Sequence, residues 1–311
     1  MKKIATREGY GKALAKLGTK YPNMVVLDAD LSRSTRSYEF CKYNPERFFN
    51  MGIAEQNLMG TAAGLAAAGK IVFASTFAIF ATGRAFEQIR NSIAYPCLNV
   101  KIAASHAGLT VGADGASHQA IVDVAIMRAL PNMQVIVPAD AIEAEKAIWA
   151  VAAQKGPAYL RLGRAPVPVI YPEEAEFELG KATLLREGRE ATIIACGIMV
   201  AESLLAAEEL AEEGFAVRVL NMSTLKPLDE GAILQAARET GALVTAEEHS
   251  IIGGLGSAVA EVVGENCPVP LERVGVKDVF GESGEPDELL EKYGLRAVNI
   301  KEAVRRVIRR K

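Results

Sequence analysis

A single carboxylate, Glu55, follows a short apolar run and Gly52 and opens a segment made largely of glycine and alanine. Small side chains let two backbones approach closely, so we expect a helix at about 54–68 that packs between elements or between chains. Glu55 would lie in its first turn, shielded from water. Two interpretations are open. Glu55 is a helix-start carboxylate that suits the helix dipole, or a buried acid whose pKa desolvation raises, so that it donates as well as accepts a hydrogen bond.

Two of the three histidines, His106 and His118, stand at the ends of a glycine-rich loop that also carries Asp114. Their spacing does not suit a zinc site. A long loop with two histidines and an aspartate after a predicted strand suits a polar pocket, whereas a histidine at a helix start often serves only as a cap. The residues alone leave both interpretations open. The third histidine, His249, lies beside a glycine-rich turn and is expected to be structural.

Two phenylalanines and two arginines also lie near predicted strand or helix ends. Phe77 and Phe80 follow a predicted strand at 70–76 and on their own indicate core packing. Arg7 lies in the first turn of a predicted helix, where a cation slightly opposes the helix dipole. Its position therefore hints at a purpose other than helix stability. Arg164 follows the last predicted strand of the first half of the chain.

Strands and helices alternate along the whole chain, which predicts two α/β domains with mostly parallel sheets. Ligands of such sheets bind at the carboxyl ends of the strands. Asp30 and Ser34 lie in the polar loop that follows the first long strand. We expect the first domain at 1–165, a proline-stiffened linker at 166–185 and the second domain at 186–311.

Capping residues help to place the helices. Thr6 is expected to cap the first helix, and Asp140 with Glu143 to form a capping box for the helix that ends near 153. In the first domain the predicted helices are 6–17, 54–68, 82–94, 119–130 and 141–153, and the predicted strands are 24–27, 70–76, 99–104, 134–137 and 158–162. In the second domain the helices are 200–212, 230–239, 257–264, 287–293 and 299–309, and the strands are 191–195, 216–220, 243–246 and 270–276.

Composition excludes several classes of protein. The 311 residues carry a formal net charge of −3, and lysine and arginine cluster only at the very end, where cations suit a helix C-terminus, so polyanion binding is not expected. The four cysteines are scattered without metal-ligand spacing and are expected to be free thiols of a reducing compartment. No apolar run approaches the ~18 residues that cross a bilayer, and the N-terminus lacks a signal pattern. A cytoplasmic location is therefore expected.

Seven short runs, in order along nearly the whole chain, share one resemblance. They are Ala5-Thr6-Arg7, Asp28-Ala29-Asp30-Leu31, Met51-Gly52-Ile53-Ala54-Glu55-Gln56, Ser75-Thr76-Phe77, residues 106–119, Val137-Pro138-Ala139-Asp140 and Glu247-Glu248-His249-Ser250-Ile251-Ile252-Gly253-Gly254. With them the chain resembles the C-terminal section of transketolase, most closely the C-terminal subunit of a split transketolase. The resemblance implies a thiamine-diphosphate-enzyme pyrimidine-binding domain followed by the transketolase C-terminal domain.

The resemblance also implies the cofactor thiamine diphosphate and assigns residues to it. Glu55 matches the glutamate that bonds the aminopyrimidine ring and favours the tautomer that removes the thiazolium C2 proton. Such a carboxylate must share a proton, which desolvation makes possible. Phe80 matches the aromatic that stacks on the pyrimidine, Phe77 lines the same pocket, and Asp30 belongs near the cofactor side of the cleft.

Other residues match those that the family uses for sugar-phosphate substrates. The implied ligands of the substrate phosphate are Arg7, Ser34, His106 and Arg164; forked guanidinium groups suit an oxyanion. Asp114 and His118 fall in the same loop. The resemblance gives Asp114 the C2 hydroxyl of the sugar and gives His118 a place near the reacting carbonyl, as a proton-transfer partner.

One part of the family's active site is missing from this chain. Transketolases bind Mg²⁺ and the diphosphate with a Gly-Asp-Gly run and a later asparagine, and this sequence contains no Gly-Asp-Gly. The resemblance therefore implies a partner chain, an N-terminal transketolase subunit that carries the metal and diphosphate site. An assembly of two copies of each chain would move a two-carbon ketol unit between sugar phosphates.

Two other functions remain open. The β-subunit of a 2-oxo-acid dehydrogenase's thiamine component has the same two domains, but it has no need for residues that suit a phosphorylated sugar. A non-catalytic assembly or regulatory subunit that kept the fold is the second alternative. The intact set of polar residues disfavours it.

Overall fold

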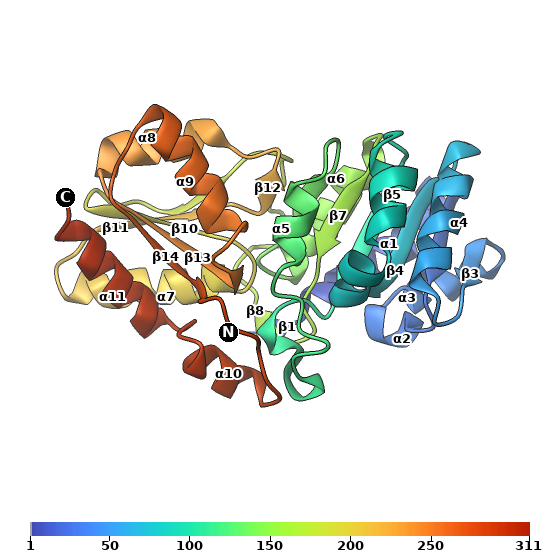
Figure 1. Ribbon diagram of the computed structural model, residues 1–311, viewed down its shortest axis with the longest axis horizontal. Coiled ribbons are helices and arrows are strands. Elements are labelled where there is room, and N and C mark those ends of the chain that lie inside the picture. Colours follow the sequence, from blue (N-terminus) through green and yellow to red (C-terminus); the bar gives the residue numbers. More distant parts are fainter. Residues whose placement is uncertain (1) are drawn as a thin grey trace.

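Two β-sheets, each covered by helices, organise the computed structural model, which describes residues 2–311 (Figure 1). The first sheet has seven strands in the order β12-β6-β7-β5-β4-β2-β3, and the second has five in the order β14-β13-β10-β11-β9. The predicted fold of two α/β domains with mostly parallel sheets is confirmed. No helix within residues 2–311 has both the length and the apolar character that a membrane crossing needs.

The first sheet is parallel except at one edge. Its parallel strands are β2 (Met24–Asp28), β3 (Phe48–Asn50), β4 (Ile71–Phe77), β5 (Val100–Ser105), β6 (Gln134–Ile136) and β7 (Ala158–Arg161). The edge strand β12 (Thr224–Lys226) comes from the second half of the chain and pairs antiparallel with β6.

Side chains alternate between the two faces of this sheet, as strand geometry requires. Met24 and Val26 of β2 pack with helices α1 (Thr6–Lys20) and α6 (Ala141–Ala153), whereas Val25 and Leu27 pack on the other face. That other face is covered by α4 (Glu55–Ala67), by π-helical turns η2 (Phe80–Arg84) and η3 (Gln88–Ala94), and by α5 (Asp123–Arg128). Short helices complete this half: α2 (Ser32–Thr35), α3 (Tyr38–Cys41), η1 (Pro45–Arg47) and η4 (Leu109–Asp114).

The second sheet is also sandwiched between helices. Its strands are β9 (Thr183–Arg186), β10 (Ala191–Ala195), β11 (Val217–Asn221), β13 (Leu243–Ser250) and β14 (Leu271–Val276), of which only β9 is antiparallel to its neighbour. Helices α7 (Met199–Glu212), α10 (Pro286–Lys292) and α11 (Ala297–Ile308) share one apolar core; α8 (Glu230–Thr240) and α9 (Leu255–Asn266) pack together on the opposite face.

The segment predicted as a linker contains regular structure. Its strand β8 (Val167–Pro168) pairs with β1 (Lys3–Ile4), and β9 joins the second sheet. Two- to four-residue strands rich in proline or polar residues carry no periodic signal, so the sequence did not reveal them. Together with β12, these strands tie the two halves at several points along the chain.

Two predicted caps differ in detail. Thr6 is the first helical residue and caps nothing; its hydroxyl accepts a hydrogen bond from the Gly163 backbone at 2.6 Å, which fixes α1 against the segment after β7. Asp140 does cap α6, accepting from the Glu143 backbone at 2.8 Å. The Glu143 carboxylate, however, accepts from the backbone of Ala139, one residue before the predicted partner.

Two helices begin elsewhere than predicted. The helix predicted at 119–130 is confined to α5, because Ala120 pairs with Ala107 and accepts a hydrogen bond from the Gly108 backbone. The helix predicted at 82–94 begins several residues earlier and contains two π-helical stretches. Such stretches are frequent at functional sites.

Candidate active site

The predicted site residues converge at the carboxyl ends of neighbouring parallel strands. Phe77 and Ser105 are the last residues of β4 and β5, and Arg164 follows β7. These strands lie side by side in the order β7-β5-β4-β2, so the residues after them meet at one edge of the sheet. The first turn of α1 brings Arg7 to the same edge, where it reaches Ser34 in the short helix α2 that follows β2.

Aromatic rings form the floor of the site. Phe77 stacks on the imidazole of His106 with ring centroids 3.8 Å apart and on Phe80 at 5.7 Å. His118 stands edge-on to both phenylalanines, 5.2 Å from Phe80 and 6.4 Å from Phe77. Phe77 is buried and Phe80 half-buried, so both are part of the site, and the two histidines of the loop meet across them.

His106 is held in one orientation and one protonation state. Its Nε2 lies 3.3 Å from Arg7 Nη1, which has only hydrogens to donate, so Nδ1 carries the ring proton and donates to Ser105 Oγ at 2.9 Å. Burial, helped by Arg7 and Arg164, lowers the pKa of His106 to about 3, and the ring is neutral at physiological pH. The backbone adopts a left-handed φ of 57°, a strained conformation for a histidine that is typical of functional sites.

Arg7 keeps N–H donors that take part in no hydrogen bond within residues 2–311. Its Nη1 donates to the Ser34 carbonyl at 2.9 Å, while Nε is buried and has no hydrogen-bond partner within residues 2–311. Burial and the nearby cation of Arg36 lower the pKa of Arg7, the carboxylate of Glu8, 4.0 Å from Nε, partly opposes them, and the charge of Arg164 lowers the pKa further. Since a buried N–H without a partner is costly, a guanidinium with unused donors beside the cations of Arg36 and Arg164 is suited to bind an anion.

Arg164 and Asp114 extend this cationic side of the site. Arg164 Nη1 donates to the Val111 carbonyl at 2.6 Å and lies 3.6 Å from the Asp114 carboxylate. Both side chains are about two-fifths exposed, at 42% and 39%. Both are therefore free to meet a ligand from solvent.

Glu55 is buried, as predicted, with 5% of its surface exposed. Its Oε1 accepts a hydrogen bond from Arg84 Nη1 at 3.2 Å, and the Arg84 guanidinium lies over the Phe80 ring, 4.1 Å from the centroid. Arg84 is thus a flat group that donates a hydrogen bond to Glu55 and stacks on Phe80. An aminopyrimidine ring could make the same two contacts. Glu55 and Phe80 thus fit the cofactor's pyrimidine, and Arg84, whose side chain is 55% exposed, is free to leave that place.

Sequence reasoning missed Arg84. No local spacing rule marks it, because Phe80–Arg84 forms a π-helical turn, to which the four-residue spacing of an α-helix does not apply. Asp30, by contrast, was predicted but lies at the rim: it is exposed, has a φ of 64° and accepts from Asn50 Nδ2 at 2.8 Å. Ser34 contributes its backbone carbonyl to Arg7.

A buried ionic group of Arg161, Asp123 and Glu248 lies next to the end of the glycine-rich loop at Ala120. Arg161 donates from Nε to Asp123 at 2.9 Å and from Nη2 to the carbonyls of Ala120 and Glu248, both at 2.9 Å. His249 beside this group is buried and bonded to backbone atoms, as expected of a structural residue. Within residues 2–311 no cluster of three or more His, Cys, Asp or Glu side chains is placed to hold a metal ion.

Each half of the chain matches a known protein family. Residues 2–169 match the family model of the transketolase pyrimidine-binding domain, and residues 180–300 match that of the transketolase C-terminal domain. The chain belongs to the transketolase family.

Transketolase relatives of similar length are known. A protein of Methanocaldococcus jannaschii named as a transketolase C-terminal section is 56% identical over 292 residues, which are 93% of this chain and 92% of that protein. The 6-deoxy-6-sulfo-D-fructose transketolase subunit SqwH of a Clostridium species is 50% identical over 305 residues, 98% of this chain and 95% of its own. A solved structure described as a split gene transketolase, inactive beta4 tetramer, shares 58% identity, covers 99% of both chains and superposes with a TM-score of 0.91.

Proposed function

We propose that this chain is the C-terminal subunit of a two-chain transketolase that transfers a two-carbon ketol unit between sugar phosphates with thiamine diphosphate. The observation that carries the proposal is an unbroken row of contacts at one sheet edge. It runs from Glu55 through Arg84, Phe80 and Phe77 to His106 and Arg7. One end of the row suits a pyrimidine, and the other suits a phosphate.

The cofactor end consists of Glu55, Phe80 and Phe77, with Asp30 at the rim. When bound, the cofactor supplies a thiazolium carbon that carries the ketol group. Glu55 would bond the pyrimidine ring and share a proton with it, while Phe80 would offer its ring face once Arg84 has moved aside. Burial of Glu55 keeps water away from that shared proton.

The substrate end consists of Arg7, Ser34, His106, Asp114, His118 and Arg164. Arg7 and Arg164 would bind the phosphate of the sugar, since guanidinium groups pair with its oxygens through charge-assisted hydrogen bonds. His106 is neutral and already accepts from Arg7, so it would orient that guanidinium. His118, edge-on to the aromatic floor, would exchange a proton at the reacting carbonyl, and Asp114 would read the neighbouring hydroxyl.

The diphosphate and Mg²⁺ would be bound by an N-terminal partner subunit, in an assembly with two copies of each chain. Support comes from the full-length similarity to proteins named as a transketolase section or subunit. The proposal keeps the pyrimidine-binding domain at 1–165, the linking segment at 166–185 and the C-terminal domain at 186–311, and it places the enzyme in the cytoplasm.

Co-expression with the N-terminal subunit tests the reaction class. The purified complex, given magnesium and thiamine diphosphate, is expected to lengthen an aldose phosphate by two carbons at the expense of a ketose phosphate. A complex that instead acylates a lipoyl domain from a 2-oxo acid would show that the chain is a dehydrogenase β-subunit. A stably assembled, cofactor-loaded complex without either activity would indicate an assembly subunit.

A further inference from the structure

The loop that carries Asp114 and His118 is rich in glycine. Gly108, Gly112 and Gly115 all have positive φ values, of 80°, 81° and 75°. Glycine allows these conformations at no steric cost but also allows many others. The loop therefore needs contacts from outside itself to hold its two polar side chains in place.

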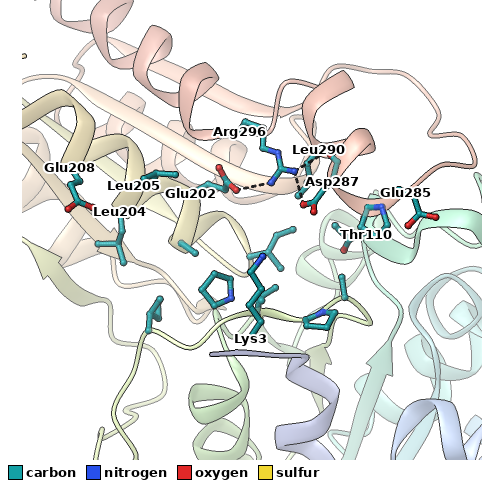
Figure 2. A pocket seen from close by; sticks show the side chains of 18 residues that line it. Lys3, Thr110, Glu202, Leu204, Leu205, Glu208, Glu285, Asp287, Leu290 and Arg296 are labelled. Carbon is teal, nitrogen blue, oxygen red and sulfur yellow. Dashed lines mark hydrogen bonds and ion pairs between the residues drawn. The ribbon is translucent and has the colours of Figure 1, made fainter. Parts of the chain in front are cut away.

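Those contacts come from the C-terminal half of the chain. Leu109, at the start of the loop, lies in the apolar core that α7, α10 and α11 share. The Thr110 backbone donates to Glu248 Oε1 at 2.7 Å, and Ser283 Oγ donates to the Ala113 carbonyl at 2.7 Å. Thr110 and Glu285 both line a cavity between the two halves (Figure 2).

Gln119, the residue after His118, links the loop to the C-terminal half by hydrogen bonds. It is 3% exposed, and its Nε2 donates both to the Leu109 carbonyl at 3.2 Å and to the Glu282 carbonyl at 2.8 Å. One amide group thus closes the loop on itself and fastens it to the segment that precedes α10. Its Oε1 is buried without a hydrogen-bond partner within residues 2–311.

Gly281 makes room for this amide. A Cβ at position 281 would lie 1.8 Å from Gln119 Oε1 and 2.7 Å from Leu109 Cδ2. Such a contact is impossible without displacing the Gln119 side chain. Residues 119 and 281, which are far apart in the sequence, therefore depend directly on one another.

We propose that Gln119 is a positioning residue through which the C-terminal half, by way of Gly281 and Glu282, fixes His118 and Asp114 for reaction. The inference rests on the proposed function for the roles of His118 and Asp114. The contacts that hold the loop belong to this chain by itself, so they can be tested with or without turnover.

The test compares four variants with the unmodified complex. Gln119→Ala removes the amide that links the loop to Glu282. Gln119→Glu keeps the shape of the side chain but loses both N–H donors. Gly281→Ala displaces the Gln119 side chain. Gln235→Ala, on the exposed face of α8, is the matched control. Since a displacement of about 1 Å in a reacting group can cost ~100-fold in rate, each change at 119 or 281 is expected to lower kcat by about 10- to 100-fold. The affinity for thiamine diphosphate should stay within twofold, because Glu55 and Phe80 are untouched.

The double variant gives the sharpest result. With alanine at 119 the contact of a residue-281 Cβ with Gln119 is gone and only the 2.7 Å contact with Leu109 Cδ2 remains, so adding Gly281→Ala should lower kcat by much less than Gly281→Ala does alone. Additive losses would overturn the coupling, and so would a loss of cofactor affinity that parallels the loss of kcat.

Hydrogen exchange of the isolated chain separates this inference from the proposed function. Backbone amides of residues 109–118 should exchange at least tenfold faster in Gln119→Ala and Gln119→Glu, with the melting temperature little changed and Gln235→Ala like the unmodified chain. Unchanged exchange in the loop refutes the positioning role. If the unmodified complex has no transketolase activity, the proposed function fails while the exchange result still decides whether Gln119 holds the loop.

Discussion

Replacing Arg7 with alanine is expected to weaken the binding of phosphorylated sugars far more than that of unphosphorylated ones. Arg7 Nη1 is already engaged by the Ser34 carbonyl and His106, but the buried Nε has no hydrogen-bond partner within residues 2–311 and lies 4.0 Å from the Glu8 carboxylate. We therefore expect Nε, and the charge that it shares, to act on the phosphate. Arg164, which follows β7 at the same edge of the sheet, is expected to act on the same phosphate.

The structure allows the magnitude to be worked out. A hydrogen bond to a charged group contributes about 1.5–3 kcal/mol, which corresponds to roughly 10- to 150-fold in affinity at about 1.4 kcal/mol per factor of ten. KM for a sugar phosphate should rise by that factor in Arg7→Ala, with a smaller change in kcat if ground state and transition state bind the phosphate equally. Arg7→Lys keeps the charge but loses the forked guanidinium, so its KM for the sugar phosphate should lie between those of the unmodified complex and Arg7→Ala.

The assay measures kcat and KM of the two-chain complex with phosphorylated and unphosphorylated forms of the same sugar. Arg189→Ala, which removes an exposed arginine from a turn of the C-terminal half, serves as the matched control. Arg7→Ala should barely affect the unphosphorylated sugar. Equal losses for the two forms would refute the reasoning, because Arg7 would then support the fold of the site and not the phosphate.

Three further predictions concern the buried charged and titratable groups. Glu55→Gln removes the proton that the carboxylate would share, so turnover at saturating cofactor should fall ~10²–10⁴-fold; a variant with nearly full kcat would disprove the assignment. Arg161→Met leaves the buried carboxylates of Asp123 and Glu248 uncompensated, at a cost of about 3–5 kcal/mol; a urea midpoint close to that of the unmodified chain would show that the ion group contributes little. The folded chain holds the pKa of His106 at about 3, whereas the unfolded chain takes up the proton near pH 6.5, so acid favours unfolding between these values. Protonation of His106 in the unfolded chain should lower the free energy of unfolding by about 2 kcal/mol between pH 7 and pH 5. His106→Gln should lose about that much less over the same range, measured by urea unfolding at the two pH values. Equal losses in His106→Gln and the unmodified chain would contradict the pKa of His106.

Much of the fold was accessible from the sequence because the signals are local. Strand β10 was predicted at its observed bounds, and α4 and α6 within a residue or two, since apolar periodicity and an Asp140 cap mark them directly. The site residues were accessible for a related reason. Apart from Arg7, which lies in the first turn of α1, these residues lie at or after the carboxyl ends of parallel strands, and adjacent strands bring those ends together.

What the sequence did not reveal depends on contacts between distant segments. The Asp123–Arg161–Glu248 group joins three elements with no common motif, and Gln119 meets Glu282 only after both halves have folded. Strand β12 leaves its own half to extend the first sheet, which no local pattern predicts. The displaced start of α5 has the same origin, because the residues before it are bonded to the glycine-rich loop.

The central claim is that this chain supplies only the pyrimidine and substrate side of a transketolase site. Calorimetry with magnesium and thiamine diphosphate tests it most directly, on the isolated chain, on the complex with the N-terminal subunit and on the complex that carries Glu55→Gln. The account predicts weak binding and no turnover for the isolated chain, tight binding and turnover for the complex, and loss of turnover in the variant complex. Tight cofactor binding together with transketolase activity in the isolated chain would contradict it.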